Sequence, residues 1–68
     1  MELLEIVATL VDLPEYGIKA GDTGTVVHIF DRPRRAYEVE FVDEDGATVA
    51  AVTLRSDQVR RVERQLPG

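Results

Sequence analysis

The segment Lys19–Phe30 constrains the fold of this chain more than any other stretch. Gly21 and Gly24 bracket an Asp-Thr pair, and glycine accepts a positive φ because it has no Cβ to clash. This turn leads directly into Thr25–Phe30, where β-branched and apolar residues follow one another. The segment therefore predicts a tight turn that opens a strand, around which the other short strands of the chain wrap.

The segment Ala36–Val42 has the cleanest alternation of apolar and polar residues in the chain. A period of two residues predicts a strand with one buried face and with its glutamates turned outward. The residues expected to face the core are Tyr37, Val39 and Phe41, and those expected to face outward are Glu38 and Glu40.

Three further segments have strand-like patterns, namely Leu4–Val11, Ala47–Leu54 and Val59–Val62. The first also fits a helical period, but a strand is favoured because Val-Ala-Thr-Leu-Val is rich in β-forming residues and no N-cap precedes it. Once one side of each strand is assigned to the core, four apolar residues remain on the opposite sides. We expect either the long loop to cover them or a protein interface to use them. These residues are Val7, Val11, Val26 and Phe30.

Turn-forming residues separate these segments. Pro14 and Gly17 break the pattern, so residues 12–21 are predicted to form one long ordered loop. Its expected anchors on the core are Leu13, Tyr16 and Ile18.

Shorter connections are predicted further along the chain. Pro33 places residues 31–35 in a hairpin tip, because proline is excluded from a central strand. Asp43–Gly46 is typical of a hairpin turn, and Ser56–Gln58 suits a single 3₁₀ turn. The whole chain, residues 1–68, is therefore predicted to be one all-β domain: a small barrel of five antiparallel strands with a 3₁₀ turn before the last strand. Its core spans about residues 4–62, followed by a C-terminal tail at 63–68.

The composition limits the classes of protein that are open to this chain. It contains no cysteine, which removes disulfides and thiolate metal sites and fits a reducing compartment. Acidic residues at the N-terminus do not suit a secretory signal, and no apolar run approaches the roughly 20 residues that span a bilayer. We expect a soluble, cytoplasmic protein that does not associate with membranes.

Several segments resemble an uncharacterised family of small stand-alone bacterial proteins. The residues that carry the resemblance are Leu13–Val27, Tyr37–Asp43 and Val52–Leu54, and the likeness covers about residues 4–62. Members of that family are predicted SH3-like barrels without an assigned activity, so the resemblance implies an SH3-like barrel here. Some relatives lie beside other small genes, which implies pairs of the toxin–antitoxin kind.

The Gly-Asp-x-Gly-Thr-Val-Val core that begins at Gly21 also resembles the entry strand of other SH3-like barrels. These include KOW-type ribosomal and transcription-factor modules and the small stromal subunit of photosystem I. This wider resemblance implies a barrel that binds nucleic acid, or one that serves as a structural subunit of a larger complex.

The sequence contains no constellation that predicts catalysis or metal binding. His28 is the only histidine, and it has no second histidine or cysteine to complete a metal site or a triad. The acids at 43–45 fail the EF-hand spacing, because Phe41 and Val52 then fall on ligand positions. The glycines match no phosphate-binding motif. We therefore expect a protein that is not an enzyme and has no cofactor and no metal.

Charged residues are grouped along the chain, whose net charge is −5. Seven arginines stand against one lysine, and a planar guanidinium suits pairing with carboxylates or phosphates at interfaces. The alternative is that these residues are solvated loop and tail residues. The candidate interaction surface comprises Glu15, Tyr16, Arg32, Arg34, Arg35, Asp43, Glu44 and Asp45.

Three functions are compatible with these features. The favoured one is a non-catalytic protein-interaction module, an accessory or inhibitory, antitoxin-like partner of another small bacterial protein or of a second copy of itself. The first alternative is a KOW-like nucleic-acid binder, which an overall acidic chain with two Tyr and two Phe disfavours. The second alternative is a structural subunit of a larger complex.

Overall fold

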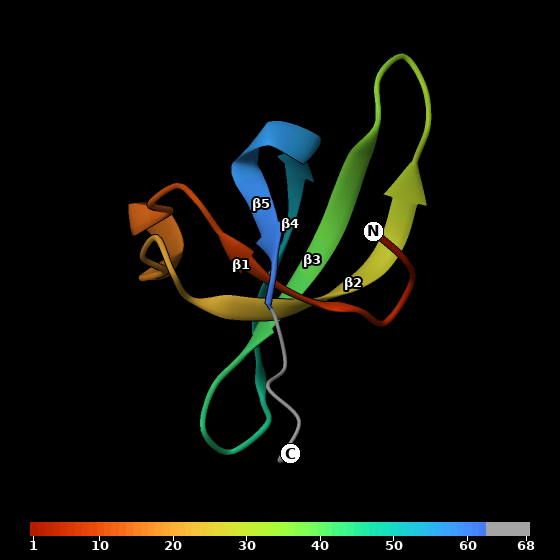
Figure 1. Cartoon of the computed structure of the whole chain (residues 1–68). Coiled ribbons are helices and arrows are strands. Elements are labelled where there is room, and N and C mark those ends of the chain that lie inside the picture. Colours follow the sequence, from red (N-terminus) through yellow and green to blue (C-terminus); the bar gives the residue numbers. More distant parts are fainter. Residues whose placement is uncertain (63–68) are drawn as a thin grey trace, which may run out of the picture.

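The computed structural model of the chain describes residues 1–62, so the predicted tail at 63–68 lies outside the described residues. The prediction of an all-β fold with five antiparallel strands is confirmed (Figure 1). The strands form one sheet in the order β4-β3-β2-β1-β5, so the last strand pairs with the first. Their bounds are β1 Ile6–Thr9, β2 Thr23–Phe30, β3 Ala36–Val42, β4 Thr48–Arg55 and β5 Val59–Arg61.

Two 3₁₀ turns complete the fold. The predicted turn before the last strand is η2, Ser56–Gln58. A second turn, η1 at Pro14–Tyr16, lies within the long loop and was not expected from the sequence. Proline supplies the φ of its first turn, and Gly17 ends it with a left-handed φ of 70°.

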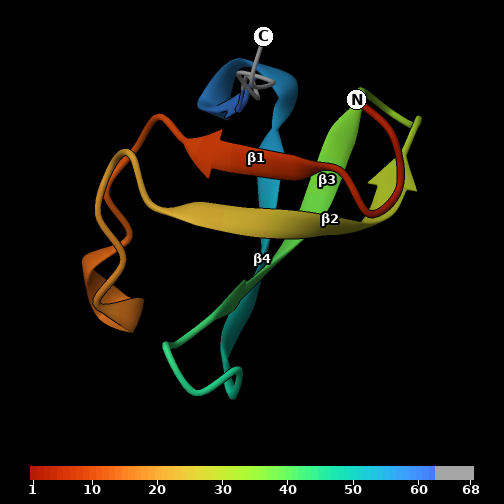
Figure 2. The same cartoon turned by 60° about the horizontal axis from the view of Figure 1, so that its bottom comes forward.

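Strand β2 joins the two halves of the sheet. Its first residues pair with β1, and its later residues pair with β3. Figure 2 shows β1 and β2 running side by side across the direction of β3 and β4, so the sheet folds over on itself. The crossing point lies at Gly24, which is opposite Val7 of β1 and next to Thr25, the partner of Glu40 of β3.

Gly24 is required by close packing rather than by a turn conformation, which corrects the prediction that both glycines serve the turn. Only Gly21 of that pair has a positive φ, at 97°. A Cβ at Gly24 would lie 2.7 Å from Cγ1 of Val39 and 2.8 Å from the carbonyl oxygen of Glu40. Glycine therefore lets the two layers of the folded sheet touch at this point.

The face assignment was right for β3 and wrong for β1 and for part of β2. Tyr37, Val39 and Phe41 are buried as predicted, whereas Val7 and Val26 are also fully buried instead of lying on the opposite faces. A register shift between Val26 and His28 explains the error in β2, because a bulge reverses the alternation of side chains beyond it. In β1 the neighbours cover both faces, since Ala8 and Thr9 are buried as well.

The apolar core lies between the two halves of the folded sheet and beneath the long loop. Val11 is half-buried and packs against it, while Phe30 is exposed. The buried residues of the core are Val7, Ile18, Val26, Tyr37, Val39, Phe41, Leu54 and Val59.

The long loop is closed at its base by backbone hydrogen bonds. The amide of Thr9 donates to the carbonyl of Asp22 (3.0 Å), and the amide of Gly21 donates to the carbonyl of Thr9 (2.8 Å). Of the predicted anchors, Ile18 is buried and Leu13 packs partly buried against the core, but Tyr16 is 43% exposed. The loop is therefore held by two apolar residues rather than three.

We predict that Gly24→Ala destabilises the fold by about 1–3 kcal/mol, because the added methyl group overpacks the crossing point. Thermal unfolding should show a fall in Tm of about 4–8 °C for each kcal/mol lost. Gly46→Ala is the matched control, since its Cβ would meet no neighbour and only its φ of 81° opposes alanine. A Tm for Gly24→Ala at or above that of Gly46→Ala would contradict the close-packing role.

We also predict that Ile18→Ala lowers stability by about 2–4 kcal/mol, because it removes a buried anchor of the loop. Tyr16→Ala should change stability by less than about 0.5 kcal/mol, as expected for an exposed side chain. Urea unfolding of the two variants measures the difference. Equal losses would show that the loop does not depend on Ile18.

Candidate functional site

The structure divides the candidate interaction surface into two parts at opposite ends of β3. The β2–β3 loop with its arginines precedes β3, and the acidic β3–β4 turn follows it (Figure 1). We call the first part the basic end, made of Arg32, Arg34, Arg35 and Arg55. We call the second part the acidic end, made of Asp43, Glu44 and Asp45.

The basic end is assembled from the β2–β3 loop and the last residue of β4. The register of β3 and β4 sets Ala36 opposite Arg55, which brings Arg55 beside the arginine loop. A hollow is lined by Arg34, Arg35 and Arg55 together with residues of η2. An adjoining hollow is more apolar and includes Phe30 and Pro33 among its walls.

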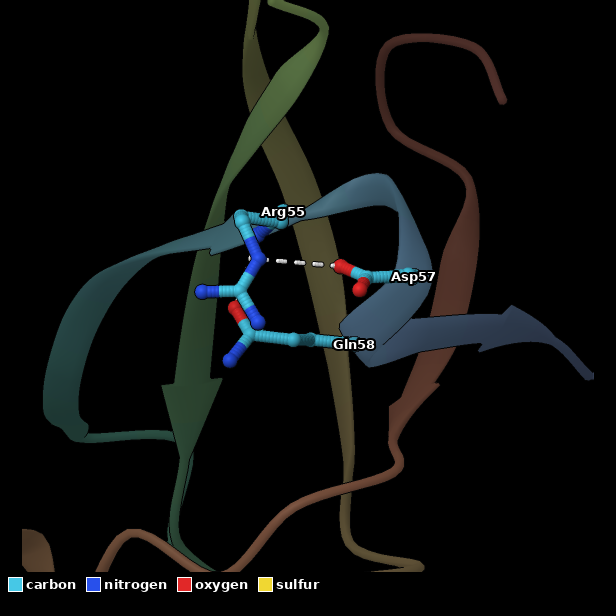
Figure 3. A network of polar contacts seen from close by, with 3 residues as sticks. All are labelled: Arg55, Asp57 and Gln58. Carbon is cyan, nitrogen blue, oxygen red and sulfur yellow. Dashed lines mark hydrogen bonds and ion pairs between the residues drawn. The ribbon is translucent and has the colours of Figure 1, made fainter.

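Two arginines of the basic end are held in place by acids of the same end. The Arg35 guanidinium donates to Oδ1 of Asp31 (2.8 Å), and Nε of Arg55 donates to Oδ1 of Asp57 (3.1 Å; Figure 3). The Tyr37 hydroxyl first, and the Asp31 carboxylate second, raise the pKa of Arg35 above its ordinary value, so it stays cationic. These exposed ion pairs orient the guanidinium groups more than they stabilise the fold.

Backbone contacts position Arg55 further. Its amide donates to Oε1 of Gln58 (2.9 Å), which ties the end of β4 to η2 (Figure 3). Within residues 1–62, Arg32 and Arg34 make no ion pair and no hydrogen bond through their guanidinium groups. These two side chains therefore offer the donors of the basic end that a partner can use.

All three acids of the acidic end are exposed, and the carboxylate of Asp43 also supports the turn. Oδ1 of Asp43 accepts hydrogen bonds from the amides of Asp45 (2.9 Å) and Ala47 (3.0 Å), and Gly46 completes the turn with a positive φ. Side-chain oxygens that cap backbone amides in this way favour tight turns. Glu44 and the Asp45 carboxylate remain available for contacts outside the fold.

The long loop lies at the acidic end. Gly17 and Ile18 line a hollow together with Asp43 and Glu44, and Asp22 adds a further acid to it. Glu15 and Tyr16, just before them on η1, are both exposed. The structure therefore groups the candidate residues as a purely acidic end with one aromatic residue, and a basic end that is remote from it.

Other residues considered from the sequence do not form a site. His28 is exposed on β2, pairs across the sheet with Glu38, and its ring meets that of Phe30 edge to face with 4.5 Å between centroids. In the part of the chain that the structure describes, no three His, Asp or Glu residues are grouped as metal ligands. None of the elements described is a helix with the length and apolar character needed to cross a membrane.

Sequence reasoning missed two contributors to the basic end. Arg55 was counted among the arginines, but its place beside Arg34 follows from the register of β3 and β4, which cannot be read from the sequence. Phe30 was predicted to lie on an outward face, where either the long loop covers it or a protein interface uses it, but it was not linked to the arginines; it lines the hollow next to Pro33. The predicted hairpin tip at residues 31–35 was the useful signal. Pairing the strands on either side of it would have brought Phe30 and Arg55 close to the arginine loop.

The fold and these two ends define a class: a small all-β protein of five antiparallel strands, whose surface charge is separated along one strand. The chain belongs to the family described as Domain of unknown function (DUF4926), which matches residues 3–61. The predicted membership of an uncharacterised family is thereby confirmed. No curated protein and no solved structure matches the chain.

We predict that Asp43→Ala destabilises the β3–β4 hairpin by about 1 kcal/mol, since two backbone amides lose their acceptor. Asp43→Asn keeps a carbonyl oxygen in place of Oδ1 and should retain most of the stability. Thermal unfolding of both variants, with Glu44→Ala as the control, gives the comparison. If Asp43→Ala and Glu44→Ala melt together, the carboxylate does not support the turn.

Proposed function

We propose that this protein is a non-catalytic protein-interaction module that binds its partner through the charged ends of β3. The observation that carries the proposal is the basic end, where guanidinium groups from the β2–β3 loop and from the end of β4 gather beside the apolar walls of Phe30 and Pro33. Interfaces are enriched in arginine and aromatic residues, and charged groups on their rims select the partner.

The fold supports this function by analogy. The strand order β4-β3-β2-β1-β5 and the 3₁₀ turn before β5 are compatible with the SH3-like barrel that the sequence resemblance implies. Such barrels commonly bind peptides and proteins through loops and aromatic grooves. We assign the exposed loop residues Glu15 and Tyr16 and the acidic end to the same role.

In its finer form, the proposal is that the partner is another small bacterial protein encoded nearby, which this chain assists or inhibits in the manner of an antitoxin. The test is co-expression of the tagged chain with the product of each adjacent gene, followed by purification. We expect one product to co-purify at a fixed stoichiometry. The variant Arg32→Glu/Arg34→Glu replaces two cations by acids. It should lower the recovery of the co-purified product by about tenfold, as expected for charge contacts at an interface.

Lys19→Glu/Arg60→Glu is the control for this experiment, because it makes the same change of net charge at two exposed cations outside the basic end. It should leave recovery close to that of the unchanged chain. Equal recovery of both variants would remove the basic end from the interface. Failure of every neighbouring product to bind would contradict the antitoxin-like form of the proposal.

Nucleic-acid binding is the second candidate, and the four arginines of the basic end are the observation that favours it. The acidic end and the net charge of −5 oppose it, because both repel phosphates. Fluorescence anisotropy with RNA and DNA at low salt decides between the two. Binding that falls steeply with salt would favour a nucleic-acid binder over a protein-interaction module. A structural subunit of a larger complex would instead co-purify in an assembly with several proteins.

A further inference from the structure

The two edges of the sheet differ in length and in character. One edge is β5, which has three residues, two of them Arg60 and Arg61. The other edge is β4, which has eight residues. Thr48–Leu54 contains no charge, no proline and no glycine, and four of its seven residues are Val or Thr. Native proteins often prevent an edge strand from pairing with another chain by placing charges or proline on it or by keeping it short. Along Thr48–Leu54, β4 has none of these three features.

The outer edge of β4 is open in the part of the chain that the structure describes. There β4 forms ladder pairs with β3 alone, and apart from β3 only η2 packs closely against it, near its end. Val49, Ala51 and Thr53 are exposed. A bulge at Val49 disturbs the start of the strand, which leaves Ala50–Leu54 as a regular stretch with unpaired backbone groups on one side.

The charges at the two ends of β4 determine the direction in which another strand fits. The strand begins just after the acidic end and finishes in the basic end at Arg55. A second β4 that runs antiparallel to the first, about a two-fold axis near Val52, brings each acidic end beside the basic end of the other copy. A parallel arrangement would instead place like charges together. The chain is therefore complementary to itself in the antiparallel direction.

Self-pairing through β4 also closes the assembly. A two-fold interface uses the same edge on both copies, and the edges that remain are the short, basic β5 strands. The product is a dimer with one continuous sheet of ten strands rather than a fibre. Although each chain carries a net charge of −5, the opposite charges are those that meet at this interface.

We propose that the occupant of the β4 edge is a second copy of this chain, so that the protein is an antiparallel β4–β4 homodimer. This proposal rests on the proposed function, a protein-interaction module that uses the charged ends, and it adds a second copy of the chain as a partner that binds through the β4 edge. Pairing through one strand buries less area than the roughly 1,200–2,000 Å² of a stable complex, so the expected dissociation constant is micromolar or weaker.

The test is sedimentation equilibrium of the purified chain from about 10 μM to about 1 mM, a range chosen for a weak interface. At low salt the average mass should rise from 7.6 kDa towards twice that value. Ala51→Lys/Thr53→Lys places a lysine of one copy opposite a lysine of the other, and should weaken self-association at least about tenfold. Within one chain these lysines face Glu40 and Glu38 of β3, so the variant should stay folded.

Thr25→Lys/His28→Lys is the matched control. It places two lysines beside the same glutamates, but on the inner strand β2 instead of the edge. This variant should dimerise like the unchanged chain. A chain that stays monomeric up to the highest concentration, or an edge variant that associates as strongly as the control, would overturn the proposal.

A charge exchange tests the antiparallel direction. Arg32→Glu/Arg34→Glu makes both ends of the chain acidic, and Glu44→Lys/Asp45→Lys makes both ends basic. Each variant alone should associate less than the unchanged chain, whereas an equimolar mixture should recover association as a heterodimer. A mixture that associates no better than the separate variants would exclude antiparallel pairing.

These experiments separate the dimer from the broader function. A monomeric chain that still co-purifies with the product of an adjacent gene would overturn the dimer and leave the interaction module in place. A chain that neither self-associates nor binds such a product would contradict both proposals.

Discussion

The contact at Gly24 is the constraint on which the rest of the fold depends. Gly24 pairs with β1, the next residue, Thr25, pairs with both β1 and β3, and the backbone of Gly24 lies against Val39 and Glu40 of β3. Because the two layers meet there, Val7 and Val26 can share one core with Val39. A chain of this length buries a smaller fraction of its surface than a larger domain does, so each contact between its halves matters more.

Much of the fold could be predicted from local patterns, because alternation in Ala36–Val42 and turn residues at 31–35 and 43–46 act over short distances. The orientation of β1 and β2 could not be predicted, because a bulge after Val26 reverses the alternation and both faces of β1 are covered. For the candidate site, the sequence identified the charged loops as a set. Their separation into two ends depends on strand register, which a single sequence does not contain.

The surface charge changes from basic to acidic along β3, and the net charge of the chain does not reveal this polarity. A net charge of −5 describes an acidic protein, but Arg32 and Arg34 lie in the loop before β3, whereas Glu44 and Asp45 lie in the turn after it. Any partner, whether another protein or a second copy, therefore meets a molecule with two unlike ends. Orientation at such a surface is selected by electrostatics, while affinity depends on the strand edge and the apolar walls beside the arginines.

The closure of the long loop by the main chain has a practical consequence. Its base is held by amides and carbonyls of Thr9, Gly21 and Asp22, which no side-chain replacement at the tip removes. The chain also lacks cysteine, so a single Glu15→Cys substitution on η1 introduces a unique thiol at an exposed position. A fluorophore or spin label attached there would report on the approach of a partner without disturbing the sheet.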